Sequence, residues 1–157
     1  MLKPRAEAPR MPRGYGVPTD GSGAELLPWS WAEEQLAKAR NYWVCTTRAD
    51  GRPHAVPVWG VWFDGAVWFG TNPESAKGRN IARDPRVVIH LESGDDVVIL
   101  EGDVEPPAVV PQDVAEAYEQ KYGHRVERLF SLRPRVAHTW TEQDFVRNAT
   151  RWVFAQA

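Results

Sequence analysis

The chain reads Val67-Trp68-Phe69-Gly70-Thr71-Asn72-Pro73-Glu74-Ser75-Ala76-Lys77-Gly78-Arg79-Asn80-Ile81, an apolar segment that turns at Thr-Asn into a polar one. The apolar part predicts a buried strand, and the polar part predicts a helix from Pro73 to about Arg83. Asn72 is a favoured N-cap. Pro73 suits the first helical position because its missing N–H would have had no partner there.

The start of this helix has the chemistry of a phosphate-binding site. Free backbone N–H groups and the positive end of the helix dipole both attract anions. Ser75 and Lys77 would face the same spot, with Arg79 as a further candidate. The structural alternative is a surface lysine with no ligand, and the combined corner, caps and serine argue against it. We therefore predict a phosphorylated cofactor that lies across a β-sheet.

Composition excludes several classes of protein. The 157 residues suffice for one core, and 43% hydrophobic and 25% charged residues are ordinary for a globular protein. A net charge of −2 does not favour a nucleic-acid binder. No apolar run approaches the roughly 18 residues that span a bilayer, and the N-terminus lacks the apolar segment of a secretory signal. The single cysteine, Cys45, fits a reducing cytoplasm.

The chain divides into an N-terminal extension, residues 1–28, and a domain, residues 29–157. The extension is rich in proline, glycine and charge, so we expect it to be flexible or to wrap a partner subunit. Ser30 and Glu33 form a capping box that predicts a helix to about Arg40.

Hairpin signals dominate the domain. Asp50-Gly51 and Asp64-Gly65 separate apolar runs, which predicts an antiparallel meander. The expected strands are Tyr42–Arg48, Pro53–Phe63, Ala66–Thr71, Arg86–Glu92, Asp96–Glu105, Arg135–Trp140 and Arg151–Ala155. The expected helices are Gln112–Tyr122, a possible one near Val126–Leu132, and a turn capped by Thr141. Six or seven strands with peripheral helices predict a mainly β fold, a small closed barrel.

The strand Pro53–Phe63 is apolar on both faces, so both should be covered, one by the barrel and one by a second subunit or a flat ligand. Its prolines place part of it at an edge or bulge, where free backbone groups could bind the rim of a planar ring. A bulge without a ligand remains the alternative. Trp43, Trp59, Trp62 and Trp68 could line a ligand pocket or an interface, or simply fill the core.

These residues resemble the FMN-binding split-barrel superfamily, which includes pyridoxamine 5′-phosphate oxidase and the flavin/deazaflavin-dependent oxidoreductases. The resemblance is clear over about residues 30–105 and looks closest to the actinobacterial deazaflavin enzymes. It is carried by Arg52-Pro53-His54, Val56-Pro57-Val58-Trp59, Phe69-x-Thr71-Asn72-x-x-Ser75-x-Lys77-x-x-Asn80, Asp84-Pro85-Arg86-Val87, Glu101-Gly102 and Ala149-Thr150-Arg151-Trp152.

The resemblance implies a homodimer with the cofactor between two split barrels of six to seven strands. Thr71, Ser75 and Lys77 would then bind the cofactor phosphate, and the backbone of Val56 to Trp59 would meet the ring. Trp140 is a candidate for a ring contact from the partner subunit.

One departure matters. Pyridoxamine phosphate oxidases place an Arg and a Lys at the ends of the strand that matches His54–Gly60, where this chain offers only His54. Their closing Arg-x-His is here Arg135-Val136-Ala137-His138, with different spacing. The resemblance therefore argues against that activity. It favours the deazaflavin coenzyme F420, whose phosphodiester suits Ser75, Lys77 and Arg79. Arg83, Arg86 or the N-terminal arm could meet the anionic tail.

The histidines and carboxylates lack metal-ligand spacing, so the sequence predicts no metal. Cys45 is expected to be a small core residue. His54 is the best functional histidine because the ring-contact strand begins there, although a structural role is slightly favoured. The sequence points to a protein that transfers a hydride between F420 and a small conjugated or aromatic acceptor. The alternatives are an FMN enzyme of the same fold, or a non-catalytic flavin, deazaflavin or tetrapyrrole binder.

Overall fold

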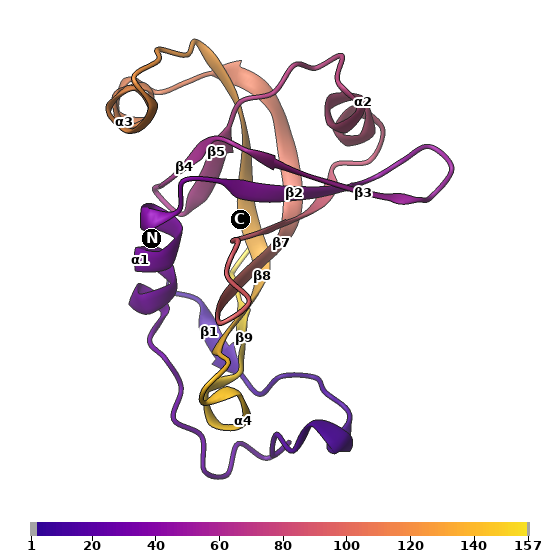
Figure 1. Cartoon of the computed structure of the whole chain (residues 1–157), viewed down its shortest axis with the longest axis vertical. Coiled ribbons are helices and arrows are strands. Elements are labelled where there is room, and N and C mark those ends of the chain that lie inside the picture. The colour runs from indigo at the N-terminus through magenta and orange to yellow at the C-terminus, as the bar shows by residue number, and fades with distance from the viewer. Residues whose placement is uncertain (1–2, 157) are drawn as a thin grey trace.

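The computed structural model describes residues 3–156, in which a long central sheet carries helices at both ends (Figure 1). Short helices cap an elongated sheet, and α2 and α4 lie at opposite ends of it. The elements in chain order are β1 (Arg5–Glu7), a 3₁₀ turn (Arg13–Tyr15), α1 (Trp29–Lys38), β2 (Tyr42–Thr47), β3 (Pro53–Val58), β4 (Gly60–Phe63), β5 (Ala66–Phe69), α2 (Ala76–Arg83), β6 (Arg86–His90), β7 (Asp96–Val109), α3 (Gln112–Tyr122), β8 (Arg128–Thr141), α4 (Phe145–Asn148) and β9 (Thr150–Val153).

The barrel closes at a corner, Trp59. The expected strand Pro53–Phe63 breaks there into β3, which pairs with β2, and β4, which pairs with β5. The remaining order runs from β2 through β6 and β7 to β8, and β8 returns to β5. The mainly β split-barrel class is therefore confirmed. The described chain has nine strands rather than six or seven, because β1 was not predicted and one expected strand is divided.

Strand β8 explains why the barrel is split. Its first half pairs with β5 at residues 130–132, and its second half pairs with β9 at residues 136–139. The helical segment expected near Val126–Leu132 is wrong, because β8 already begins at Arg128. Its hydrogen-bond partners are distant in sequence, so local pattern could not reveal them.

The barrel interior holds the main core. Its largest fully buried side chains include Tyr42, Phe69, Leu36, Ile89 and Leu100. A second cluster under α3 contains Val61, Val114, Tyr118, Tyr122 and Leu129. Of the strand tryptophans, Trp62 joins the core through an edge contact with Trp29, with 6.3 Å between ring centroids.

Two expected helix caps are wrong. Helix α1 begins at Trp29, and Pro28 occupies the N-cap position without a side-chain bond. Glu33 accepts a 2.9 Å bond from the Trp29 indole, so it does not close a capping box with Ser30. Helix α4 begins at Phe145. Thr141 instead exchanges two hydrogen bonds with the side chain of Asn148.

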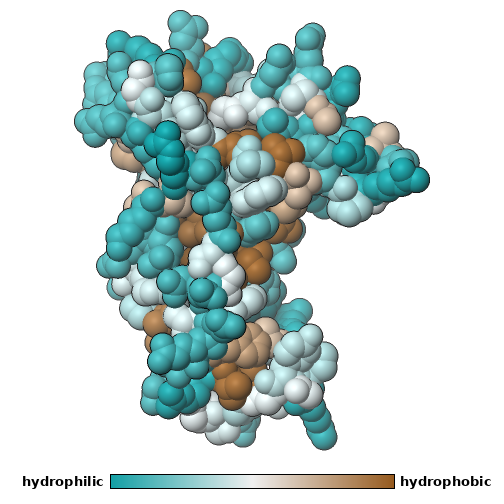
Figure 2. Space-filling model, in the orientation of Figure 1, coloured by the Kyte–Doolittle hydropathy of each residue, from teal (hydrophilic) through white to brown (hydrophobic). Residues whose placement is uncertain are grey.

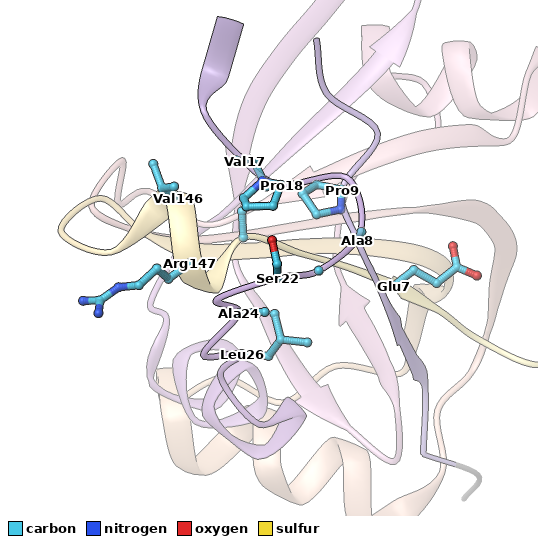
Figure 3. A pocket seen from close by; sticks show the side chains of 12 residues that line it. Glu7, Ala8, Pro9, Val17, Pro18, Ser22, Ala24, Leu26, Val146 and Arg147 are labelled. Carbon is cyan, nitrogen blue, oxygen red and sulfur yellow. The ribbon is translucent and has the colours of Figure 1, made fainter. Parts of the chain in front are cut away.

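The described part of the N-terminal extension lies against its own chain. Strand β1 pairs with β9, and the following segment packs over α4 around a small cavity of about 50 Å³ (Figure 3). The Glu25 N–H donates to the Arg147 carbonyl at 3.0 Å. Hydrophobic side chains gather over the strands and at the α4 end of an otherwise hydrophilic face (Figure 2). In the described chain, no helix is both long and apolar enough to cross a membrane.

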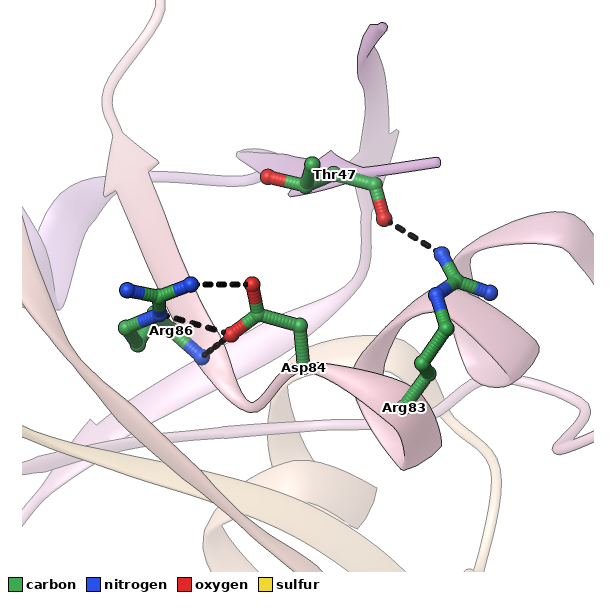
Figure 4. Close-up of polar contacts among 4 residues, drawn as sticks. All are labelled: Thr47, Arg83, Asp84 and Arg86. Carbon is green, nitrogen blue, oxygen red and sulfur yellow. Dashed lines mark hydrogen bonds and ion pairs between the residues drawn. The ribbon is translucent and has the colours of Figure 1, made fainter. Parts of the chain in front are cut away.

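Helix α2 ends at Asp84-Pro85, as the sequence predicts, and a polar cluster fixes this end (Figure 4). Arg86 donates two 2.8 Å bonds to the Asp84 carboxylate, which lower the pKa of Asp84 to about 2. Arg83 donates to the Thr47 carbonyl at 2.7 Å. These contacts tie the helix end to β2 and β6.

Candidate functional site

The corner before α2 is a compact turn, and its cap differs from the expected one. Asn72 is not the N-cap, because its side chain accepts from the Glu74 N–H at 2.9 Å within the turn. Ser75 is the N-cap, and its hydroxyl accepts from the Gly78 N–H at 3.1 Å. The helix therefore begins at Ala76, three residues later than Pro73. Both residues are good caps, and the Asn72 turn decides between them.

The helix start still offers donors to an anion. No bond joins the N–H groups of Ala76 and Lys77 to the described chain, as is usual for the first turn. The Ser75 hydroxyl donates to the Asn72 carbonyl at 2.6 Å, so its own proton is engaged. Thr71 Oγ1 lies 3.3 Å from Ser75 Oγ. Because the Ser75 proton is engaged, Thr71 is the donor in this contact. The available donors are thus two backbone N–H groups and the half-buried Lys77. We call this group the anion seat.

Gly78 is a residue of the seat that sequence reasoning missed. A Cβ at this position would lie 2.5 Å from the Pro73 carbonyl oxygen and 2.6 Å from that of Asn72. Only glycine lets the turn fold this closely onto the first helical turn. The signal was a glycine within the helix start, where it lowers helix propensity.

His54 lies on the same side of the sheet as α2. Asn80 donates to the Thr46 hydroxyl at 3.0 Å, and Thr46 pairs directly opposite His54. Burial and the positive charges of Arg48 and Lys77 lower the pKa of His54, which favours its neutral form. Its Nδ1 is buried and has no partner among the described residues. A buried polar atom without a partner is rare, and a ligand is one way to satisfy it.

Strand β3 is an edge strand within the described chain. It pairs with β2 alone, so every second residue of β3 turns its backbone groups outward without a ladder partner among the described residues. Pro57 is exposed, and Val58 is buried in the core. The prediction that prolines mark an edge is confirmed, and the free edge is the feature that a planar ring would need.

Trp59 follows at the corner and remains 38% exposed. Its ring stacks on Tyr122, with centroids 4.6 Å apart and an interplanar angle of 6°. His124 lies on it at 5.9 Å. The sequence could not predict this contact, because Tyr122 is distant along the chain.

A basic groove adjoins the seat. It has a volume of about 340 Å³ between α2 and the β2–β3 turn. Its lining residues are Arg48, Ala49, Asp50, Ala76, Arg79, Asn80 and Arg83. Ala76 lines the groove, and its N–H is one of the donors of the seat. The groove and the seat therefore adjoin at Ala76. Arg86 is engaged with Asp84 instead.

One predicted site residue lies apart. Trp140 pairs with Val97 near the α4 end of β8 and contacts Phe145 edge-on at 5.5 Å. Helix α2 is at the other end of the sheet (Figure 1). Within one chain, the structure therefore does not bring Trp140 to the seat, the groove or β3.

The outer sheet face crosses strands β2, β6, β7, β8 and β9. We use this name for the half-exposed residues Trp43, Cys45, Val88, His90, Ile99, Glu101, Val136, His138 and Val153. Most are apolar. Among its polar groups, His138 Nε2 lies 3.4 Å from Glu101 Oε1, and His90 Nδ1 lies 2.7 Å from the Leu91 carbonyl. Among the described residues, no three metal-ligating side chains come together.

Comparisons with known proteins agree with this fold. A sequence model of the family described as pyridoxamine 5′-phosphate oxidase matches residues 31–150. No curated protein matches the chain.

Several solved structures resemble it. The conserved hypothetical protein Rv2991 from Mycobacterium tuberculosis is 24% identical, with a TM-score of 0.63 over 74% of this chain and 86% of that one. A protein described as an F420 reductase is 21% identical, with a TM-score of 0.55 over 67% and 94%. A heme-binding protein from Mycobacterium smegmatis is also 21% identical, with a TM-score of 0.54 over 73% and 55%. Likenesses at these identities concern the fold alone.

Proposed function

The chain belongs to the pyridoxamine 5′-phosphate oxidase family, and from this premise we propose that it is an oxidoreductase that binds coenzyme F420. The acceptor would be a small conjugated or aromatic molecule. The observation that supports this most is the anion seat beside the free edge of β3. The buried Nδ1 of His54 adds to it, since it has no partner among the described residues and the positive charges of Arg48 and Lys77 lower the pKa of this histidine.

The side chains of the chain itself would bind and orient. Lys77 and the N–H groups of Ala76 and Lys77 would hold the phosphodiester, since both charge and helix dipole favour an anion there. The outward backbone of β3 would hold the ring, and apolar neighbours would exclude water. When bound, the coenzyme supplies the hydride chemistry, and the protein supplies position and electrostatics. We assign no protein group as a general acid.

Activity as a pyridoxamine 5′-phosphate oxidase fits these residues poorly. The strand that would carry the basic phosphate ligands offers His54 alone between His54 and Gly60. The burial and charge that lower the pKa of His54 make it a weak partner for a phosphate.

The basic groove favours F420 over FMN. FMN ends in its phosphate, whereas F420 continues into an anionic oligoglutamate tail, and the groove leads away from the seat past Arg48 and Arg79. Equilibrium titration of the purified protein with each cofactor tests the proposal. We expect micromolar or tighter binding of F420 and weaker binding of FMN. The reverse order would replace F420 with FMN, and binding of neither would reject the proposed function.

The double variant Arg48→Ala/Arg79→Ala tests the tail. An exposed ion pair contributes about 0.2–1 kcal/mol and the variant removes two, so we expect roughly 2- to 30-fold weaker binding of F420 with a long tail. The loss should shrink at high salt, which screens exposed charges. FMN serves as the control ligand, because it has no tail and its affinity should not change. An equal loss of affinity for both ligands would show that these arginines do not bind the tail.

We propose that the outer sheet face joins two copies of the chain. An apolar sheet face normally packs on another surface. His90 and His138, two of its polar groups, already lie close to partners within the chain. The variant Ile99→Asp would bury an unpaired carboxylate there, which should weaken self-association at least about 100-fold. Val109→Asp is the matched control, because Val109 is 74% exposed. Sedimentation velocity should give a dimer for wild type and Val109→Asp, and a monomer for Ile99→Asp. A monomeric wild type would contradict the proposal.

A second candidate is a binding protein without turnover, for a flavin, a deazaflavin or a tetrapyrrole. The similarity of fold to a heme-binding protein supports this second candidate. Mixing the protein with reduced coenzyme and a panel of enones, quinones and tetrapyrroles separates the two. Oxidation of the coenzyme by any of these acceptors supports the proposed oxidoreductase. If the coenzyme stays reduced with every acceptor in the panel, the protein is a binding protein without turnover.

A further inference from the structure

A cluster of polar and charged side chains lies beneath the Trp59 corner. Lys121 Nζ donates to the Gly60 carbonyl at 2.9 Å and to the Tyr42 hydroxyl at 3.2 Å. The Gly60 N–H donates to the Tyr122 hydroxyl at 3.0 Å, which also lies 2.7 Å from the carbonyls of Arg40 and Gly60. We call Arg40, Tyr42, Lys121 and Tyr122 the corner cluster.

The cluster joins segments that are far apart in sequence. Helix α3 supplies Lys121 and Tyr122, while Tyr42 opens β2 and Arg40 precedes it. Helices α1 and α3 both pack on β4 at the same side of the barrel (Figure 1). The cluster therefore fixes the point at which the chain leaves the ladder of β2 and enters that of β5.

The same cluster supports the ring of Trp59. Tyr122 stacks beneath it, and the Arg40 guanidinium lies 5.5 Å from the centroids of both rings. The Lys121 ammonium lies 5.2 Å from the Tyr122 centroid and 4.9 Å from that of Tyr42. Gly60 itself has no room for a side chain, because a Cβ there would lie 2.7 Å from the Trp68 carbonyl oxygen.

We propose that Lys121 is a positioning residue that holds Trp59 and the end of β3 in the orientation that receives the coenzyme ring. It acts through the Gly60 carbonyl and the Tyr122 ring and touches neither coenzyme nor substrate. The part that concerns the coenzyme rests on the proposed function, whereas the part that concerns Trp59 does not.

The contacts of Lys121 at the corner depend on its charge, which changes with pH. A charge-assisted hydrogen bond is roughly twice as strong as a neutral one, and a cation–π contact needs the cation. Burial, with a smaller effect from Arg40, lowers the pKa of Lys121 to about 8. A cleft of about 430 Å³ reaches Lys121, so protons can exchange with solvent. The ammonium should hold the corner below pH 7 and release it as pH rises through about 8.

The phenols around Lys121 do not titrate in this range. Burial raises the pKa values of Tyr42, Tyr118 and Tyr122, so these phenols stay neutral. The charged and titratable groups that lie around Lys121 are Lys38, Arg40, Tyr42, Tyr118, Tyr122 and, across Trp59, His124.

The local change at the corner can be distinguished from alkaline unfolding, because deprotonation of Lys121 does not lower the free energy of unfolding. The pKa of Lys121 in the folded protein lies below its ordinary value of 10.5. The unfolded chain therefore binds more protons between these pH values, and the contribution of Lys121 to the free energy of unfolding rises from pH 8 towards 10.5. The corner should thus loosen while this contribution to global stability grows.

Tryptophan fluorescence of the cofactor-free protein tests the proposal, with Trp59→Phe subtracted to isolate Trp59. Between pH 6 and 9.5 we expect a transition near pH 8 in the wild type. In Lys121→Arg, which keeps its charge, the low-pH signal should persist. In Lys121→Met, which has no charge, the high-pH signal should be present throughout. A transition that survives in Lys121→Arg, or a wild type without one, would overturn the proposal.

Coenzyme affinity gives the second readout. From pH 7 to 9 we expect F420 binding to weaken about tenfold more in the wild type than in Lys121→Arg, a comparison that cancels ionisation of the coenzyme itself. Equal pH dependence in both proteins, with the fluorescence transition present, would overturn the link to the coenzyme. If F420 fails to bind at any pH while Trp59 shows its transition, the proposed function fails and the role of Lys121 at the corner stands.

Discussion

Gly78→Ala is expected to lower cofactor affinity by about 10- to 100-fold while the fold persists. The new methyl group would lie 2.5 Å from the Pro73 carbonyl oxygen, closer than a methyl group can approach it. Relief of such overpacking costs about 1–3 kcal/mol. Because the neighbouring atoms belong to the backbone of the turn, the turn must move away from the helix. The donors of the anion seat then lose their common direction.

Gly94→Ala is the matched control, because a Cβ there would meet no atom within 4 Å. Circular dichroism and thermal melting establish that both variants fold, and equilibrium titration gives their affinities. We expect Gly94→Ala to bind as the wild type does. A folded Gly78→Ala protein with unchanged affinity would separate the seat from cofactor binding.

Lys77→Ala is expected to weaken cofactor binding by roughly 10- to 150-fold. A hydrogen bond to a charged group contributes about 1.5–3 kcal/mol, and Lys77 is the lysine that the helix start presents to an anion. Lys77→Arg should retain much of the affinity, since it keeps the charge but changes its geometry. Lys38→Ala, an exposed lysine of α1, is the control. Equal affinities for Lys77→Ala and Lys38→Ala would remove Lys77 from the site.

Short-range signals predicted much of the fold. Helix α3 has the expected bounds, Gln112–Tyr122, and α2 ends at the expected Asp84-Pro85. Both Asp-Gly pairs form turns, with φ of 47° at Asp64 and 85° at Gly51. Such signals depend on the conformational preferences of a few adjacent residues, so they can be read without the tertiary structure.

What the sequence did not reveal depends on distant contacts. The break at Trp59 lies in a mostly apolar stretch, residues 53–63, in which Gly60 follows it. It arises because the first half of the stretch pairs with β2 and the second half pairs with β5. Strand β8 was partly missed, since its partners β5, β7 and β9 come from separate parts of the chain. Pairing between distant segments overrides local propensity.

The same distinction applies to the candidate site. Ser75 and Lys77 follow from helix-start chemistry, and the structure places Ser75 at the N-cap of α2 and Lys77 in its first turn. Their role in binding a cofactor stays a prediction. The cap was misplaced by three residues, because a local sequence permits either Asn72 or Ser75 and the turn selects one. The buried Nδ1 of His54, which has no partner among the described residues, and the stacking of Trp59 on Tyr122 need the folded chain.

The central claim is that α2 begins at a seat for the phosphodiester of a flat redox coenzyme whose ring lies on β3. A crystal structure of the protein soaked with F420 tests it most directly. We predict phosphate density within hydrogen-bond distance of the N–H groups of Ala76 and Lys77, with the ring along the outer edge of β3. Coenzyme bound elsewhere with the seat empty, or a seat filled by the protein's own side chains, would contradict the account.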